Sequence, residues 1–153
     1  MRKTALVTGM HTSLAYLVAE KLIKDGNMRV IAPVRVRESD RVDALIRNYG
    51  ENVIVSDFSP LDFQEAKELV AAADYILNLD FVGMPESEHF PDFAEKVNYF
   101  YTKNFVDAVI ETGSDAKIIE LSTTGIYGGR TMKRPYAAVG HPAMPAYYDL
   151  ASV

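Results

Sequence analysis

Hydrophobic residues along the chain alternate between short continuous runs and stretches with helical spacing. The short runs are largely β-branched and cover residues 4–8, 28–34, 52–56, 75–79 and 117–121. Between them, apolar residues recur at three- and four-residue intervals, as they do on one face of a helix. Strands that alternate with helices in this way form crossover units on a parallel sheet. The pattern therefore predicts an α/β fold with a doubly wound, Rossmann-like parallel sheet of about five strands.

The spacing of apolar residues also predicts which face of each helix packs on the sheet. The first helix should end at Gly26 and bury Leu14, Leu17, Val18 and Leu22. The second should start at Ser39 or Asp40, a capping residue, and bury Val42, Leu45 and Ile46. The third, over about 62–73, should align Phe63, Ala66 and Val70.

The fourth helix is predicted to be the longest, over about 92–112, and to carry an unusually broad face. That face consists of Phe93, Val97, Phe100, Tyr101, Asn104, Phe105 and Ala108. It is wide for a helix that merely covers a sheet. An exposed apolar patch of this size indicates an interaction site or an aggregation liability.

Composition limits the class of protein. A chain of 153 residues fits one domain, so we expect a single domain over 1–153 with a loop region over 127–153, where proline, glycine and tyrosine are frequent. The net charge of −5 disfavours nucleic acid as the main partner. The chain has no cysteine, and its 3 histidines lie far apart, so no metal site is expected. No signal-like or membrane-spanning run is visible, which predicts a cytoplasmic protein without a membrane partner.

The segment over residues 4–15 carries the most information about function. An apolar run turns at Gly9 into helical spacing, as in the first strand, phosphate turn and helix of a dinucleotide-binding unit. The fingerprint has further glycines at positions 12 and 15, where this chain has Thr12 and Ala15, which are small but add a Cβ. The predicted phosphate contacts are Gly9, His11, Thr12, Ser13 and Leu14, and Thr12 should push a pyrophosphate away from the backbone. A loop histidine such as His11 is alternatively a merely exposed residue.

Several further motifs follow in an order that resembles the extended short-chain dehydrogenase/reductases, the NAD(P)-dependent epimerase, dehydratase and reductase group. They are residues 30–35, Ser56-Asp57-Phe58, residues 73–79, Val97-Asn98 with Thr102 and Asn104, and residues 121–128. The resemblance covers nearly the whole chain. It implies a dinucleotide cofactor and hydride transfer between the nicotinamide and a carbonyl or alcohol of an unidentified small-molecule substrate. It also implies a homodimer in which the fourth helix packs against its copy.

The end of the second strand bears on the choice of cofactor. An acidic residue there would bind both ribose hydroxyls and repel a 2′-phosphate, but this chain has Val34 followed by Arg35 and then Arg37. We therefore predict NADP as the cofactor, with NAD as the alternative; both arginines could instead be solvated surface residues.

Two other strand ends should face the cofactor. By resemblance, Asp57 and Phe58 lie around the adenine, although Asp57 could instead cap the turn before the third helix. At the end of the fourth strand, Leu79 and Asp80 are also expected beside the cofactor. The family usually has two small residues where Asp80 and Phe81 stand, and a carboxylate beside phosphates weakens binding unless another group screens it.

The resemblance assigns catalysis to Thr123 and Tyr148. Thr123 would hydrogen-bond the substrate oxygen, unless it only satisfies backbone groups at a strand end. Tyr148, or Tyr147, would be the acid/base. The family's active tyrosine is followed four residues later by a lysine, whereas Ala151 and Ser152 stand at that spacing here.

These observations leave three hypotheses open. The first is the nucleotide-binding part of an epimerase, dehydratase or reductase, truncated before the sixth strand and substrate region and therefore inactive alone. The second is a non-catalytic NADP-binding or redox-sensing protein. The third is an interaction module that keeps the fold and binds no nucleotide.

Overall fold

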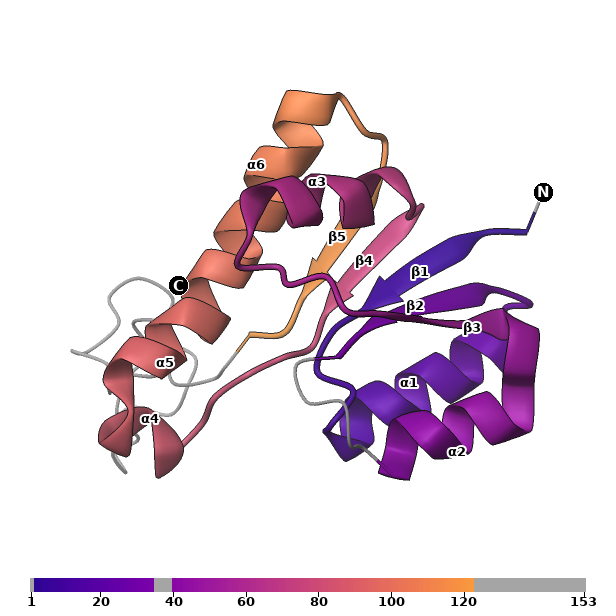
Figure 1. Cartoon of the computed structure of the whole chain (residues 1–153), viewed down its shortest axis with the longest axis horizontal. Helices are drawn as coiled ribbons and strands as arrows, with labels where there is room; N and C mark the ends of the chain where they lie inside the picture. The colour runs from indigo at the N-terminus through magenta and orange to yellow at the C-terminus, as the bar shows by residue number, and fades with distance from the viewer. Residues whose placement is uncertain (1, 35–39, 123–153) are drawn as a thin grey trace, which may run out of the picture. The chain divides into compact units, whose positions relative to one another are not determined.

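The computed structural model of the chain describes residues 2–34 and 40–122. These residues form five parallel strands: β1 (Thr4–Val7), β2 (Arg29–Pro33), β3 (Val53–Ser56), β4 (Tyr75–Asn78) and β5 (Lys117–Glu120). Their order in the sheet is β3-β2-β1-β4-β5 (Figure 1). The chain therefore places β2 and β3 on one side of β1 and then β4 and β5 on the other side. This confirms the predicted Rossmann-like parallel sheet of about five strands.

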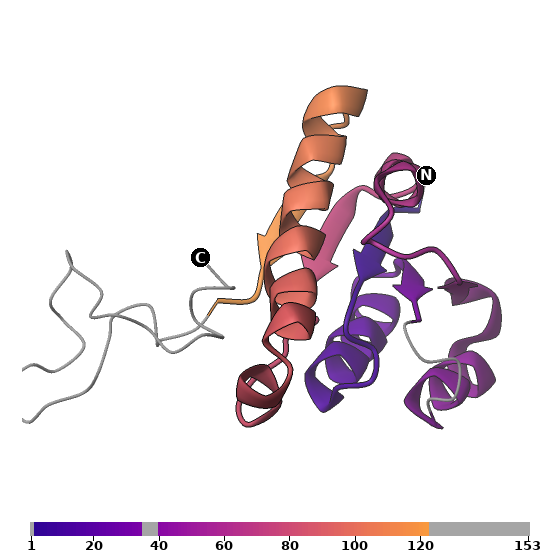
Figure 2. The same cartoon turned by 60° about the vertical axis from the view of Figure 1, so that its left-hand side comes forward.

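Helices cover both faces of this sheet, as a parallel sheet requires. Figures 1 and 2 show α1 (Ser13–Lys24) and α2 (Asp40–Tyr49) on one face, and α3 (Phe63–Ala71) and α6 (Tyr101–Thr112) on the other. Alternate residues of β1 point to opposite faces, so Ala5 and Val7 pack with α1 while Leu6 packs with α3 and α6. The first strand thus joins the two halves of the core.

The buried face of α1 differs from the prediction. Leu14 and Leu17 are 46% and 58% exposed, and the helix instead buries Ala15, Ala19 and Ile23. Small alanine side chains let the helix approach the sheet closely, and the N-cap at Thr12 fixes the helix start. In α2 the predicted Val42 and Leu45 are buried, but Ile46 is 41% exposed. The predicted Val18 and Leu22 do pack against the core, so the α1 prediction is wrong only for Leu14 and Leu17. The α3 prediction is confirmed by buried Ala66 and Val70.

The described residues fall into two compact units. Residues 2–34, 40–80 and 100–121 form the first, and residues 81–99 with 122 belong to the second. The second unit contains α4 (Glu86–His89), α5 (Pro91–Glu95) and most of η2 (Lys96–Phe100), a π-helical turn. The helix predicted over 92–112 is therefore divided into α5, η2 and α6. The expectation of one domain over 1–153 stays a prediction, because residues 123–153 lie outside the described ranges.

A search of the helices within these ranges finds none with the length and apolar character needed to span a membrane.

Thr8 fastens the end of β1 to the end of β4. Its side chain is 1% exposed. The hydroxyl donates to Asn78 Oδ1 at 2.6 Å and accepts from the backbone amides of Leu79 at 3.0 Å and Asp80 at 3.1 Å. One donor and two lone pairs are thereby all used. This single residue sets where the chain leaves β4.

Replacing Thr8 by valine keeps the shape of the side chain and removes these three bonds. We expect the free energy of unfolding to fall by about 3 kcal/mol, because two buried amides and one buried carbonyl lose their partner. Urea unfolding followed by circular dichroism measures the change. Thr4→Val is the control, since Thr4 begins the strand that Thr8 follows and its hydroxyl has no hydrogen bond to the described residues. Equal losses in the two variants would contradict this role of Thr8.

Candidate functional site

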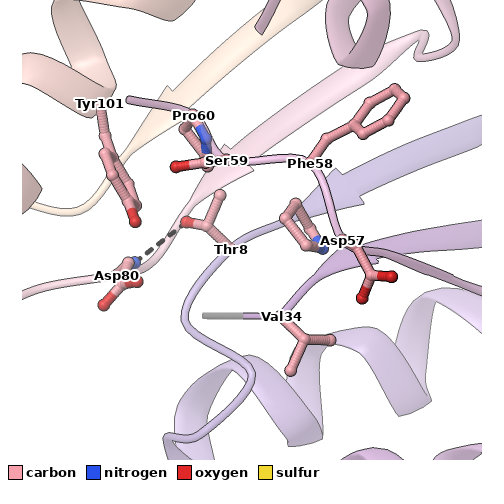
Figure 3. Close-up of a pocket in the computed structure, with 9 residues that line it drawn as sticks. Thr8, Val34, Asp57, Phe58, Ser59, Pro60, Asp80 and Tyr101 are labelled. Carbon is pink, nitrogen blue, oxygen red and sulfur yellow. Dashed lines mark hydrogen bonds between the residues drawn. The ribbon is translucent and has the colours of Figure 1, made fainter. Parts of the chain in front are cut away.

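A cavity of about 170 Å³ lies at the carboxyl ends of the central strands, within the first unit (Figure 3). Its lining consists of Thr8, Pro33, Val34, Asp57, Phe58, Ser59, Pro60, Asp80 and Tyr101. These residues follow β1, β2, β3 and β4, except Tyr101, which comes from α6. The carboxyl edge beside the strand-order reversal is where open α/β sheets hold their ligands. The cavity has room for a base-sized group, whereas sites that enclose a whole drug-sized ligand measure about 300–1,000 Å³.

Gly9 lets the turn after β1 lie directly against the end of β4. Its φ is +74°, a left-handed conformation that favours glycine. A Cβ at this position would stand 2.6 Å from the Leu79 carbonyl oxygen and 2.8 Å from the Asp80 nitrogen. The glycine is thus required by the contact with β4, independently of any phosphate.

The N-terminus of α1 faces outward beyond this turn. Thr12 is the N-cap: its amide donates to the Gly9 carbonyl at 2.8 Å, and its hydroxyl accepts from Ala15 N at 3.2 Å. The amides of Ser13 and Leu14 have no partner inside the helix, and no acceptor among the described residues binds them. Both residues are exposed. These two amides form the part of the turn that can donate hydrogen bonds to a bound anion.

Arg41 reaches this turn from the first turn of α2. Its guanidinium donates to the His11 carbonyl at 2.6 Å and to Ser13 Oγ at 3.0 Å. A positive charge is thereby held beside the turn. Sequence reasoning missed Arg41, because within α2 it looks like any polar residue on a solvated face.

Asp80 brings a buried negative charge to the cavity. The residue is 5% exposed, and its backbone amide is held by Thr8. His11 Nε2 lies 3.8 Å from Asp80 Oδ1. A protonated His11 would screen the carboxylate that the sequence placed beside the phosphates. His11 is exposed and also lies beside Asp80, so its approach to a phosphate stays a prediction.

The loop between β3 and α3 forms one wall of the cavity. Asp57 and Phe58 lie on it and are exposed. The α3 cap is Asp62, whose carboxylate accepts from Gln64 N at 2.8 Å and Glu65 N at 3.1 Å. Asp62 is thus the N-cap of α3, and Asp57 lies on the cavity wall.

Tyr101 is the cavity residue that the sequence assigned to another role. It was expected on the apolar face of the fourth helix, and it is indeed 3% exposed. Figure 3 shows its hydroxyl pointing toward Asp80. An amphipathic tyrosine on a packed face gives no signal in the sequence that its hydroxyl borders a cavity.

Asn78 connects the strand end at β4 to the strand end at β5. Its amide donates to the two Glu120 carboxylate oxygens at 3.1 and 3.0 Å, and to Thr102 Oγ1 at 3.1 Å. Glu120 as a whole is exposed, but its carboxylate lies against the buried Asn78 amide. Burial raises the pKa of Glu120 above its usual range, and the hydrogen bonds from Asn78 and Thr102 partly offset this.

Several predicted site residues lie outside the described ranges. They are Arg35 and the catalytic candidates Thr123, Tyr147 and Tyr148. A tyrosine and lysine four residues apart do occur elsewhere, as Tyr99 and Lys103. Tyr99 is exposed, Lys103 pairs with Asp107, and neither lines the cavity. We therefore assign this pair no role in the site.

A second cavity, of about 530 Å³, lies at the opposite edge of the sheet. It is lined mainly by apolar residues, including Leu22, Met28, Tyr75, Leu77 and Ile119. Lys3 at its rim is paired with Asp74 at 2.7 Å. The cavity is larger than the first, but it lies at the amino ends of the strands, away from the α1 N-terminus. Its size alone does not make it the functional site.

Comparison with solved structures shows the fold. UDP-glucose 4-epimerase from Thermotoga maritima, solved with UDP-glucose, is 21% identical, with a TM-score of 0.73 over 97% of this chain and 47% of that chain. Pal from Bacillus thuringiensis is 14% identical, with a TM-score of 0.78 over 97% and 48%. A short-chain dehydrogenase from Streptomyces avermitilis is 20% identical, with a TM-score of 0.62 over 82% and 50%. The chain spans about half the length of these structures.

No family model and no curated protein matches the sequence. The fold thus defines a Rossmann-like α/β domain. It is structurally similar to solved epimerase and short-chain dehydrogenase structures.

The raised pKa of Glu120 predicts a pH-dependent stability. The carboxylate form is disfavoured in the folded chain, so this group's contribution to stability is present below its ordinary pKa of 4.5 and is lost as the pH rises through the raised value. Glu120→Gln removes the charge and keeps an acceptor for Asn78. We expect this variant to be more stable than the wild type at pH 7 and to lose its advantage near pH 4 in urea unfolding. A constant difference across this range would contradict the assignment.

Proposed function

We propose that the chain binds a dinucleotide of the NAD(P) type, with the adenine half at the cavity. One observation carries this proposal: the cavity lies at the strand-order reversal, beside the two outward-facing amides of Ser13 and Leu14. That combination suits a ligand with a flat base and a nearby phosphate. The likeness to dehydrogenase and epimerase structures supports the same ligand class.

The residues present fit such a cofactor. Ser13 and Leu14 would hold the pyrophosphate through their amides, with the Arg41 guanidinium adding positive charge. Asp57 would accept from the adenine amino group, and Phe58 would lie against the base. His11 would screen Asp80 from the phosphates. When bound, the nicotinamide supplies or accepts a hydride.

The reaction proposed for the family that this chain resembles is hydride transfer between the nicotinamide and a carbonyl or alcohol substrate. Thr123 would polarise the substrate oxygen and Tyr148 would be the acid/base, as the family resemblance implies. A non-catalytic NADP-binding or redox-sensing protein is the second candidate. It is favoured by the buried carboxylate of Asp80 in the cavity and by Ala151 and Ser152 in place of the lysine.

A homodimer through the segment predicted as the fourth helix, residues 92–112, is a further part of the proposal. Val97, Tyr101 and Phe105 of the broad face are buried, whereas Phe93 and Phe100 are 42% and 38% exposed. Phe100, which belongs to the first unit, is therefore the residue of that unit through which a second copy would bind.

The first functional prediction is a preference for NADPH over NADH. The guanidinium of Arg35 near the 2′-phosphate should contribute about 1.5–3 kcal/mol to the binding free energy of NADPH, a preference of roughly tenfold or more. Isothermal titration with both cofactors measures it. Arg35→Ala should abolish most of the preference, and Arg47→Ala, which removes an exposed arginine from the far end of α2, should leave it unchanged. Tighter NADH binding by the wild type would refute NADP specificity, and no binding of either would refute the proposed function.

The second prediction is that the 153-residue chain binds cofactor without turning over substrate. A tyrosine with the ordinary pKa of about 10 is rarely ionised at neutral pH when no lysine lowers it. Oxidation of NADPH should stay at background with a panel of aldehydes, ketones and nucleotide sugars. Turnover that disappears in Thr123→Val or Tyr148→Phe would show instead that the chain contains a complete catalytic site.

A further inference from the structure

The loop that walls the cavity is held in place from α6. Asn104 lies one helical turn after Tyr101 and is half-buried. Its amide nitrogen donates to the Pro60 carbonyl at 2.8 Å and to the Leu61 carbonyl at 3.1 Å. The side-chain amide of Asn104 therefore donates to two consecutive carbonyls of the β3–α3 loop, one for each of its two protons.

The rest of the loop is tied to α3. Ser59 N donates to Glu65 Oε2 at 2.6 Å, and Ser59 Oγ accepts from Leu61 N at 3.3 Å. The Ser59 carbonyl accepts from Asp62 N at 3.0 Å. These bonds fix the loop to the start of the helix that follows it, and the two bonds from Asn104 connect it to α6. Tyr101 of α6 lines the same cavity, so Asn104 joins the loop to the helix that contributes another cavity residue.

We propose that Asn104 is a positioning residue for the adenine side of the site, which holds Asp57 and Phe58 where a purine nucleotide meets them. This inference rests on the proposed nucleotide binding. Asn104 itself does not line the cavity, so it acts through the loop. Loss of its amide should therefore weaken ligands that contain adenine and leave ligands without adenine unaffected.

The test compares three ligands with three variants. AMP, ADP-ribose and nicotinamide mononucleotide are titrated into the wild type, Asn104→Ala and Asn104→Asp. Alanine removes the amide while favouring the helix. Aspartate keeps the size of the side chain but places carboxylate oxygens, which only accept, beside the Pro60 and Leu61 carbonyls. Asn104→Asp should therefore bind the adenine ligands more weakly than Asn104→Ala. Thr112→Val is the matched control, because it removes one hydrogen bond from α6, to the Ala108 carbonyl, at the end remote from Tyr101.

We expect Asn104→Ala to weaken AMP and ADP-ribose about tenfold, as roughly 1.4 kcal/mol of lost interaction would. Binding of nicotinamide mononucleotide should change less than about twofold by the same arithmetic. Thr112→Val should match the wild type with all three ligands. An Asn104→Asp protein that binds like the wild type would overturn the proposal, because size alone would then explain the residue.

Amide hydrogen exchange supplies a readout that needs no ligand. In Asn104→Ala, exchange should accelerate at residues 57–62, where amides are present, and not in the second half of α6. Unchanged exchange in the loop would overturn the proposal, and so would faster exchange combined with unchanged AMP affinity. If the wild type binds neither AMP nor ADP-ribose, the proposed function fails and the positioning role fails with it, whereas the exchange data still report whether Asn104 holds the loop.

Discussion

The contact between the end of β1 and the end of β4 is the constraint on which the site depends. Thr8 uses its whole hydrogen-bonding capacity on Asn78, Leu79 and Asp80, and Gly9 leaves no room for a Cβ against the same stretch. These two strands meet where the strand order reverses. Because the chain is fixed on both sides of that point, the cavity floor, the start of α1 and the Asp80 carboxylate take defined positions.

The walls of the site are built in the same way, by polar side chains that bind backbone groups of neighbouring loops. Asn104 holds the β3–α3 loop, and Arg41 holds the turn that contains His11. In the second unit, Asn98 binds both the amide and the carbonyl of Val82 at 2.8 and 3.0 Å. Buried or half-buried backbone groups need such partners, so these residues shape loops that carry little apolar packing of their own. Asn98 and Asn104 of the fourth-helix pattern thereby receive a structural explanation, and Thr102 accepts from the Asn78 side chain.

Much of the fold could be predicted from the sequence, because its signals are local and strong. The apolar runs that gave the strands are bounded within one or two residues of β1 to β5. The buried face of α1 could be predicted only in part: Val18 and Leu22 pack against the core, but Leu14 and Leu17 are exposed and Ala15 and Ala19 are buried instead. Asp57 and Phe58, which motif order predicted around the adenine, line the cavity, and their contact with a cofactor stays a prediction. Tyr101 and Arg41 were missed, because their contacts join segments far apart in the chain.

The central claim is that an adenine dinucleotide binds at the carboxyl edge of the sheet, and mapping of backbone amide signals tests it most directly. A ¹⁵N-labelled chain would be titrated with ADP-ribose and followed by two-dimensional NMR. The account predicts shifts concentrated at residues 9–14, 57–61 and Asp80, with Met28 and Ile119 of the other cavity unchanged. Shifts confined to the residues of that second cavity, or no shifts at millimolar ligand, would contradict it.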